Sequence, residues 1–256
     1  MLDNLKDRFP RITYFDNMDG LAKQNLIMHL IFTLKSLIVV SLVMYFAPDM
    51  VPFKLLEFWT ISGTPLDWLQ AGKWLVIWGA FVTLVWCIYT QNEPRNNRHA
   101  ERILGQGIKL SIASGIGQEI LFRWGYLLSG IIMVQVFDWI LGGFFFGSGL
   151  LQLVQSKVLG PLANLTTLGT MSEFLAQSDT WAVGAGMLAT NLAYRDGHKY
   201  TGKFGVVNNW FVGMAFFYLM FTYGLLAAIL VHILYDLAII GVVYLDMVVE
   251  RYKGRV

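Results

Sequence analysis

The apolar residues of this chain gather into long runs, and these runs set the elements that the sequence predicts. A bilayer core of about 30 Å is crossed by roughly 20 apolar residues in an α-helix. Several runs approach or exceed that length, so we expect about six membrane-spanning helices. The runs cover residues 25–47, 70–91, 109–146, 181–197, 204–222 and 224–247.

Three stretches depart from this simple pattern. The run at 109–146 is too long for one span and contains several glycines. It predicts one long or broken helix, whose continuation packs against protein or lies at the interface. Residues 52–68 contain two prolines and a glycine and are expected to form an interfacial connector. Residues 148–180 are semi-polar and are expected to lie outside the membrane or on its surface, where re-entrant or interfacial helices are possible.

Basic residues predict the orientation, because cytoplasmic loops of membrane proteins carry an excess of Lys and Arg. Six crossings with both termini in the cytoplasm would place every basic cluster on that side. The intervening loops hold only Lys54 and Lys157. The clusters are Lys6, Arg8, Arg11 and Lys23; Arg95, Arg98 and Arg102; Arg195, Lys199 and Lys203; and Arg251, Lys253 and Arg255.

Composition supports the membrane assignment. The 256 residues are 56% hydrophobic and 14% charged, with a mean hydropathy of +0.54, whereas soluble domains are about 45–50% apolar and roughly 25% charged. We expect an all-α, polytopic, integral membrane protein in contact with lipid, in a prokaryotic inner membrane or a eukaryotic endomembrane. Its parts would be a polar cytoplasmic segment at 1–24, one transmembrane domain at 25–248 and a basic tail at 249–256.

Charge and cysteine usage exclude further classes. The net charge of +2, from 19 Lys and Arg against 17 Asp and Glu, indicates no nucleic-acid partner. The segment 1–24 lacks the early apolar core of a cleavable signal peptide. The single cysteine, Cys87, lies in an apolar run, so it cannot form an intramolecular disulfide and is expected to pack as a small hydrophobe.

A short set of polar residues stands inside the apolar runs. A charged side chain near mid-bilayer costs about 2.5–3.5 kcal/mol on insertion scales and usually faces the bundle interior. Spacings of four residues put Glu with Arg, and His with Asp, on shared helix faces. Three separate helices would bring these groups to the cytoplasmic half of the bundle. The set is Gln118, Glu119 and Arg123 on the third run, His198 at the end of the fourth, and His232 and Asp236 on the sixth.

Each of these groups also has a purely structural interpretation. A Glu–Arg pair four residues apart, such as Glu119 and Arg123, often serves only to stabilise the packing of helices. His232 with Asp236 suits an interhelical hydrogen bond. His198 is flanked by charged residues and suits an interfacial position. The remaining histidines, His29 and His99, are expected to be structural or solvated, without a functional role.

Three motifs in order resemble those of the CPBP family, the CAAX prenyl endopeptidases of type II and bacteriocin-processing (Abi) membrane proteins. That family has Glu-Glu-x-x-x-Arg, then aromatic-x-x-x-His, then His-x-x-x-Asn/Asp, all on transmembrane helices. Here they appear as Gln118–Arg123, Tyr194–His198 and His232–Asp236, within a match covering about residues 110–245.

The resemblance implies a glutamate-type intramembrane endopeptidase. In the family, the first Glu and the second-motif His activate a water, and the third-motif His and Asn/Asp stabilise the oxyanion. Carried to this chain, His198 would act on the water, His232 and Asp236 would lie at the oxyanion, and Arg123 would orient a carboxylate. The sequence has no His-Glu-x-x-His, so we expect no metal and no cofactor.

Two positions depart from the family pattern. Gln118 stands where the family has its first Glu, and an amide accepts no proton at neutral pH. Glu119 could serve as the base if the helix is locally broken; the chain could be a non-proteolytic relative; or Gln118 could be an introduced substitution. Asp236 replaces the more usual Asn and is expected to orient His232, which would be the principal donor.

The favoured function is therefore hydrolysis of a peptide bond in a membrane-associated or lipidated peptide or protein. A membrane binding or scaffold protein on the same fold is the alternative, because of Gln118. A transporter or haem protein using His198 and His232 is a third class, disfavoured because no inverted repeat is evident and the histidines stand singly.

Overall fold

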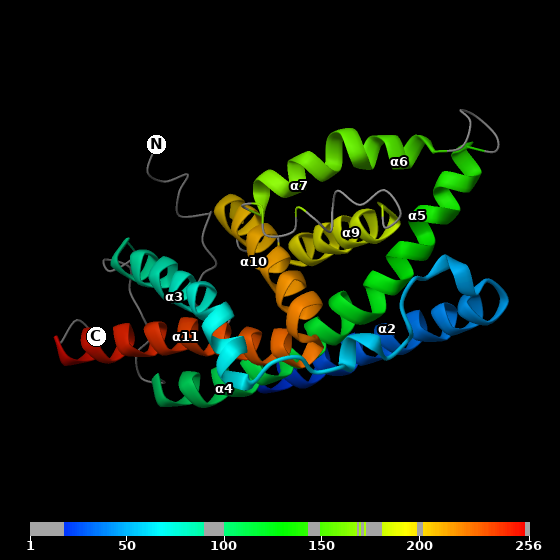
Figure 1. The fold of residues 1–256 in the computed structure, drawn as a ribbon. Coiled ribbons are helices and arrows are strands. Elements are labelled where there is room, and N and C mark those ends of the chain that lie inside the picture. Colours follow the sequence, from blue (N-terminus) through cyan, green and yellow to red (C-terminus); the bar gives the residue numbers. More distant parts are fainter. Residues whose placement is uncertain are drawn as a thin grey trace.

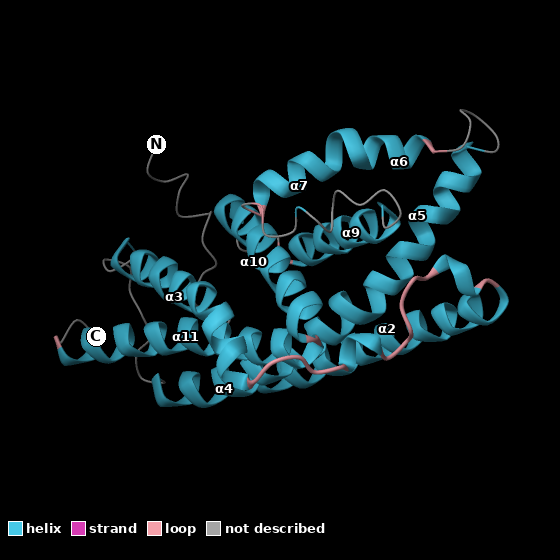
Figure 2. Ribbon diagram, in the orientation of Figure 1, coloured by secondary structure: helices cyan, strands magenta, loops and turns pink. Residues whose placement is uncertain are grey.

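The structure, a computed structural model, describes residues 18–89, 100–142, 149–167, 169, 172, 181–198 and 202–253. Within these ranges every regular element is a helix and none is a strand, so the all-α prediction is confirmed for this part of the chain (Figures 1 and 2). Five helices are long and apolar enough to cross a membrane. They span Leu26–Phe46, Pro65–Tyr89, Leu104–Leu141, Lys203–Tyr223 and Leu225–Glu250.

The first two helices are joined by the expected connector. Helix α2 covers Met18–Phe46, and α3 covers Pro65–Tyr89. Between them lie two single turns of 3₁₀ helix, η2 at Pro48–Met50 and η3 at Glu57–Trp59.

Helix α3 begins at Pro65, so the predictions of a connector to residue 68 and a span from residue 70 are wrong. The cause is a capping box: the Thr64 backbone N–H donates to Asp67 Oδ2 at 2.7 Å, and the Asp67 N–H donates to Thr64 Oγ1 at 3.4 Å. Proline suits the first turn of a helix, where its missing N–H has no intrahelical partner.

The long third run is one helical rod with an irregular centre. It consists of α4 at Ala100–Gln118, a π-helical segment η5 at Glu119–Tyr126, and α5 at Leu127–Leu141. The prediction of one long helix is correct. Its irregularity takes the form of a π-helical segment rather than a gap in the helix. Such segments are rare and frequently mark functional sites.

The semi-polar stretch is also helical where it is described. Helices α6 at Leu150–Val154, η7 at Gln155–Leu159 and α7 at Gly160–Thr166 follow one another directly and run beside α9 (Figure 1). Helix α9 covers Trp181–Gly197, with 17 residues, and is not one of the five helices of spanning length.

The last two helices form a tight hairpin. Helix α10 covers Gly202–Tyr223 and α11 covers Leu225–Tyr252, with Gly224 alone between them. Gly224 has φ +97°, in the left-handed region, and a Cβ there would overlap the backbone of Thr60. Only glycine fits a turn that is both left-handed and this close to another backbone.

Close contacts at glycines give the relative directions of the helices. Residue numbers increase together along the contacts of α3 with α11, so these two helices are parallel. Along the contacts of α4 with α11, residue numbers increase on one helix and decrease on the other, so these two helices are antiparallel. Helix α2 is likewise parallel to α4 and η5. The pairs are Gly72 with Val231, Gly79 with Tyr235, Gly107 with Ile240, Gly115 with Ile233, Gly117 with His29, and Gly125 with Thr33.

These directions require a returning segment in the middle of the chain. Helices α4 to α5 and α10 run the same way across the bundle, so the chain must come back between residues 142 and 202. Helix α9 does so, because Gly186 lies against Gly130 while Tyr194 lies against Arg123, so α9 is antiparallel to the η5–α5 segment. The start of α2 and the end of α11 consequently lie at the same end of the bundle.

The core is centred on α10, α11 and the η5–α5 segment. Leu127, Phe216, Phe217 and Leu225 have no exposed surface. By contrast, α2 and α3 expose many large apolar side chains, among them Leu34, which suits helices that face lipid.

Several basic residues used for the orientation fall outside the described residues. They are Lys6, Arg8, Arg11, Arg95, Arg98, Lys199 and Arg255, and His99 also lies outside.

Candidate functional site

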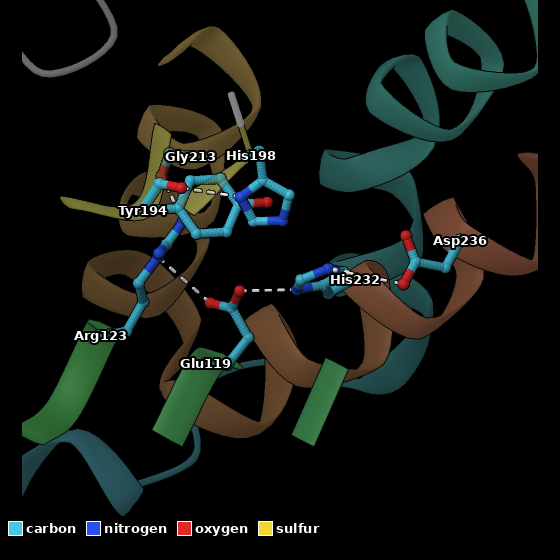
Figure 3. A network of polar contacts seen from close by, with 7 residues as sticks. All are labelled: Glu119, Arg123, Tyr194, His198, Gly213, His232 and Asp236. Carbon is cyan, nitrogen blue, oxygen red and sulfur yellow. Dashed lines mark hydrogen bonds and ion pairs between the residues drawn. The ribbon is translucent and has the colours of Figure 1, made fainter. Parts of the chain in front are cut away.

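Glu119 and Arg123 form the centre of a polar network inside the bundle (Figure 3). Both side chains are 0% exposed, and Arg123 Nε lies 3.3 Å from Glu119 Oε2. The ion pair expected from the four-residue spacing is therefore present, within the π-helical segment η5. A buried charge is stable only when it is paired and hydrogen-bonded, so the rest of the site can be followed outward from these two groups.

The second carboxylate oxygen of Glu119 binds His232 on α11. His232 Nδ1 lies 2.7 Å from Glu119 Oε1, and both side chains are buried. A carboxylate accepts at this contact, so Nδ1 carries a hydrogen and donates it. Glu119 thereby fixes the ring orientation of His232. Sequence spacing gave no sign of this contact, since 113 residues separate the pair.

Asp236 lies on the other side of the same imidazole. His232 Nε2 is 3.7 Å from Asp236 Oδ2, an ion-pair distance too long for a hydrogen bond. The His232 ring also stacks on Phe216, with centroids 4.4 Å apart and planes inclined by 16°. The imidazole is therefore held at Nδ1 and on one face, while Nε2 is directed toward Asp236 (Figure 3).

The guanidinium of Arg123 is enclosed by aromatic rings. Its carbon lies 4.4 Å from the centroid of Tyr194 and 4.8 Å from that of Phe217, which is within the range of cation–π attraction. Nη2 donates to the Gly213 carbonyl at 3.0 Å, and Nη1 is buried without a hydrogen bond among the described residues. Glu119 is therefore paired with a cation that is itself fixed from three sides.

Tyr194 connects the second motif to the first. Its ring contacts Arg123, and its carbonyl oxygen lies 2.7 Å from His198 Nδ1. The carbonyl can only accept, so Nδ1 donates and Nε2 carries the lone pair of the neutral ring. Burial lowers the pKa of His198 to about 4, which keeps the imidazole neutral near pH 7.

Gln118 is the last residue of α4, directly before the π-helical segment. Its Oε1 atom is buried and has no hydrogen-bond partner within the described part of the chain. Of the two adjacent side chains, Glu119 and not Gln118 joins the Arg123–His232 network.

Other residues shape the site but gave no signal in the sequence. Gly213 supplies the carbonyl that Arg123 binds and leaves room for Asn191, whose Nδ2 donates to the Trp210 carbonyl at 3.0 Å. Phe216 and Phe217 cover His232 and Arg123. A glycine or a phenylalanine in an apolar run is indistinguishable from ordinary core residues, so only the structure could identify them.

The network runs from Arg123 through Glu119 and His232 to Asp236, with a carboxylate on each side of the His232 ring. Such a network of side chains can hold imidazoles in fixed orientations and tautomers. Proton transfer and hydrogen bonding to a reacting carbonyl both require this. Among the described residues, no group of three or more His, Cys, Asp or Glu side chains is placed to hold a metal ion.

Comparison with known proteins found no matching family model, no matching curated protein and no matching solved structure.

Proposed function

We propose that the chain is an intramembrane endopeptidase of the CPBP type, which hydrolyses a peptide bond in a membrane-associated or lipidated peptide. The observation that carries the proposal is the buried Glu119 carboxylate that binds Arg123 and His232 at once, with His198 held nearby through Tyr194. The three motifs that resemble the family thus supply side chains to one network (Figure 3).

Peptide hydrolysis needs an oriented water, a donor for the oxyanion and a proton for the leaving amine. In this proposal His198 accepts a hydrogen bond from the water at Nε2. His232, held at Nδ1 by Glu119, donates from Nε2 to the oxyanion when the ring carries both protons, and Asp236 balances its charge. Gln118 cannot take the proton of the water, so another acceptor is required.

We further propose six crossings with both termini in the cytoplasm. The five apolar helices and the antiparallel return of α9 support this count. The short length of α9 suits a helix that is enclosed by others rather than by lipid, because nine of its residues are buried.

The test is cleavage of peptides tethered to a membrane by a lipid or a transmembrane anchor, by the purified chain in liposomes. We expect cleavage by the chain as it stands or by its Gln118→Glu variant, and loss of cleavage on His232→Ala in the active background. If neither form cleaves any peptide of a broad tethered set, the peptidase proposal is wrong.

The alternative is a non-proteolytic binding protein on the same fold. Gln118 favours it, because the family's base is absent and the Gln118 oxygen has no partner among the described residues. In that case His198→Ala and His232→Ala would leave partner binding intact and neither form of position 118 would hydrolyse a peptide, which separates the two proposals.

A further inference from the structure

His29 on α2 was expected to have no functional role, yet it lies against the segment that carries the first motif. A Cβ at Gly117 would come within 2.9 Å of His29 Nδ1, so the imidazole lies directly on the α4 backbone. Nδ1 is buried and has no hydrogen-bond partner among the described residues. A buried, unpaired polar atom is uncommon in native structures and needs an explanation, such as a water or ligand at the site.

A second unpaired atom lies on the next residue of α4. Gln118 Oε1 is also buried without a partner in the described part of the chain. Gln118 and Phe122 are four residues apart, and residues at that spacing lie close to one another on a helix. The Phe122 ring lies between two neighbours, with centroids 6.4 Å from His29 and 5.5 Å from Tyr194.

This arrangement brings His29 toward the second motif as well. Tyr194 holds His198 through its carbonyl, and their rings are 4.6 Å apart. His29 is close enough to His198 to interact with it electrostatically, as is His232. At the beginning of η5, His29 lies against Gly117 and His232 binds Glu119, while His198 is joined to the segment through Tyr194. The family resemblance accounts for only His198 and His232.

None of the motif residues is suited to act as the general base that takes a proton from the water. Gln118 accepts no proton. Glu119 accepts a hydrogen bond from His232 at Oε1, and its Oε2 lies 3.3 Å from Arg123 Nε as an ion pair without a hydrogen bond, so a proton on Glu119 would leave the buried Arg123 without its counter-charge. His198 and His232 each use Nδ1 in a hydrogen bond, to the Tyr194 carbonyl and to Glu119, whereas Nδ1 of His29 is buried without a partner among the described residues.

We propose that His29 is the general base of this site, which replaces the glutamate that the family has at position 118. The inference rests on the proposed peptidase function and adds a residue from α2 to it. Gln118 and His198 hold the water by hydrogen bonds, and His29 Nδ1 takes one of its protons.

The step balances without any further reactant. As the water oxygen bonds to the scissile carbonyl carbon, one water proton passes to His29 Nδ1 and the carbonyl oxygen becomes the oxyanion beside His232. The C–N bond then breaks, and the proton on His29 passes to the leaving nitrogen. The products are a carboxylic acid and an amine, and His29 returns to its neutral form.

The experiment compares His29→Gln with the unmodified chain in liposomes containing a cleavable tethered peptide. Glutamine keeps the size and hydrogen bonding of the site but accepts no proton. We expect kcat to fall by about 100-fold or more, the usual contribution of a general base, with KM changed by less than about threefold. The matched control is Thr33→Ser, one turn along the same helix, which keeps the hydrogen bond from the Thr33 hydroxyl to the His29 carbonyl and should leave cleavage within about twofold.

A second pair of variants separates a catalytic role from a structural one. In the Gln118→Glu background the carboxylate can take the proton, so His29→Gln should then lower kcat by less than about tenfold. An equal loss in both backgrounds, or no loss in either, overturns the assignment of His29. Cleavage by Gln118→Glu but not by the unmodified chain also overturns it, while leaving the peptidase proposal intact. If no variant cleaves, the proposed function itself is wrong.

Discussion

Glu119 and Arg123 have no exposed surface, so their contribution to stability depends on what each of their polar atoms contacts. Arg123 is held by Glu119, by the Gly213 carbonyl and by aromatic rings. Removing one member of a buried pair leaves an uncompensated charge, which costs about 3–5 kcal/mol. Replacing both by apolar residues avoids that cost.

Arg123→Leu should therefore lower the free energy of unfolding by about 3–5 kcal/mol, measured by denaturant titration in detergent micelles. The double variant Glu119→Leu/Arg123→Leu should recover part of that loss. As a control, Lys253→Ala removes a half-exposed ammonium that lies 3.7 Å from the buried Glu250 carboxylate, and it should cost less than Arg123→Leu because water reaches the Lys253 side chain. Equal effects of Arg123→Leu and Lys253→Ala would contradict the buried pair.

His198 gives a pH dependence whose direction follows from its environment. Burial lowers its pKa to about 4 in the folded state, against about 6.5 when unfolded. Between these values the unfolded chain binds more protons, so stability falls as the pH decreases from about 6.5 toward 4. His198→Gln removes this contribution, so the variant should lose less stability than the unmodified chain between pH 7.5 and pH 5, as measured by unfolding titrations at both pH values. Parallel losses in the two proteins would contradict a buried neutral His198.

The sequence could predict some of these contacts and not others. The Glu119–Arg123 pair follows from a four-residue spacing on one helix. The Glu119–His232 contact depends on how α4 lies against α11, which is set by close packing at Gly115. Such packing has no signature in hydrophobic periodicity, so the central contact of the site became visible only in three dimensions.

At the scale of helices, the bundle depends on crossings where small residues let backbones meet. Gly186 on α9 lies against α5, and a Cβ there would come within 2.8 Å of the Ile131 backbone nitrogen and 3.2 Å of Gly130. Backbone atoms cannot move aside as a flexible side chain can. Glycines at such positions are a common device for packing transmembrane helices.

Gly186→Ala should therefore destabilise the protein by about 1–3 kcal/mol, the usual cost of overpacking, and this would appear as a lower thermal unfolding midpoint in detergent. Gly241→Ala is the matched control in α11, because a Cβ there meets nothing within 4 Å. It should be neutral or stabilising by up to about 1 kcal/mol, since alanine favours a helix. If Gly186→Ala were as harmless as Gly241→Ala, the α5–α9 crossing would be wrong.

Most helices could be located from the apolar runs alone, because a run near 20 residues has few other structural uses. The start of α3 was missed, since the capping box at Thr64 outweighs the proline and glycine that suggested a loop. The π-helical segment at Glu119–Tyr126 was also unforeseen. The hydrophobic pattern of an apolar run does not distinguish a π-helical segment from an α-helix.

At the scale of the whole molecule, the orientation proposal can be tested from two exposed positions. Thr60 lies beside Gly224, at the start of α11, and Lys253 follows the end of that helix. The 28 residues of α11 rise about 42 Å at 1.5 Å per residue, more than the thickness of a bilayer core. The two positions should consequently lie on opposite sides of the membrane.

Single cysteines at Thr60 and Lys253, introduced into a Cys87→Ser background, should differ in labelling by a membrane-impermeant maleimide. With six crossings and cytoplasmic termini, Thr60→Cys should react with the maleimide in intact cells, whereas Lys253→Cys should react only after the membrane is permeabilised. Because Thr60 lies beside the start of α11, no topology in which α11 crosses the membrane puts both positions on the same side. Labelling of both cysteines in intact cells would therefore contradict α11 as a membrane crossing, and labelling of Lys253→Cys but not Thr60→Cys would contradict the cytoplasmic termini.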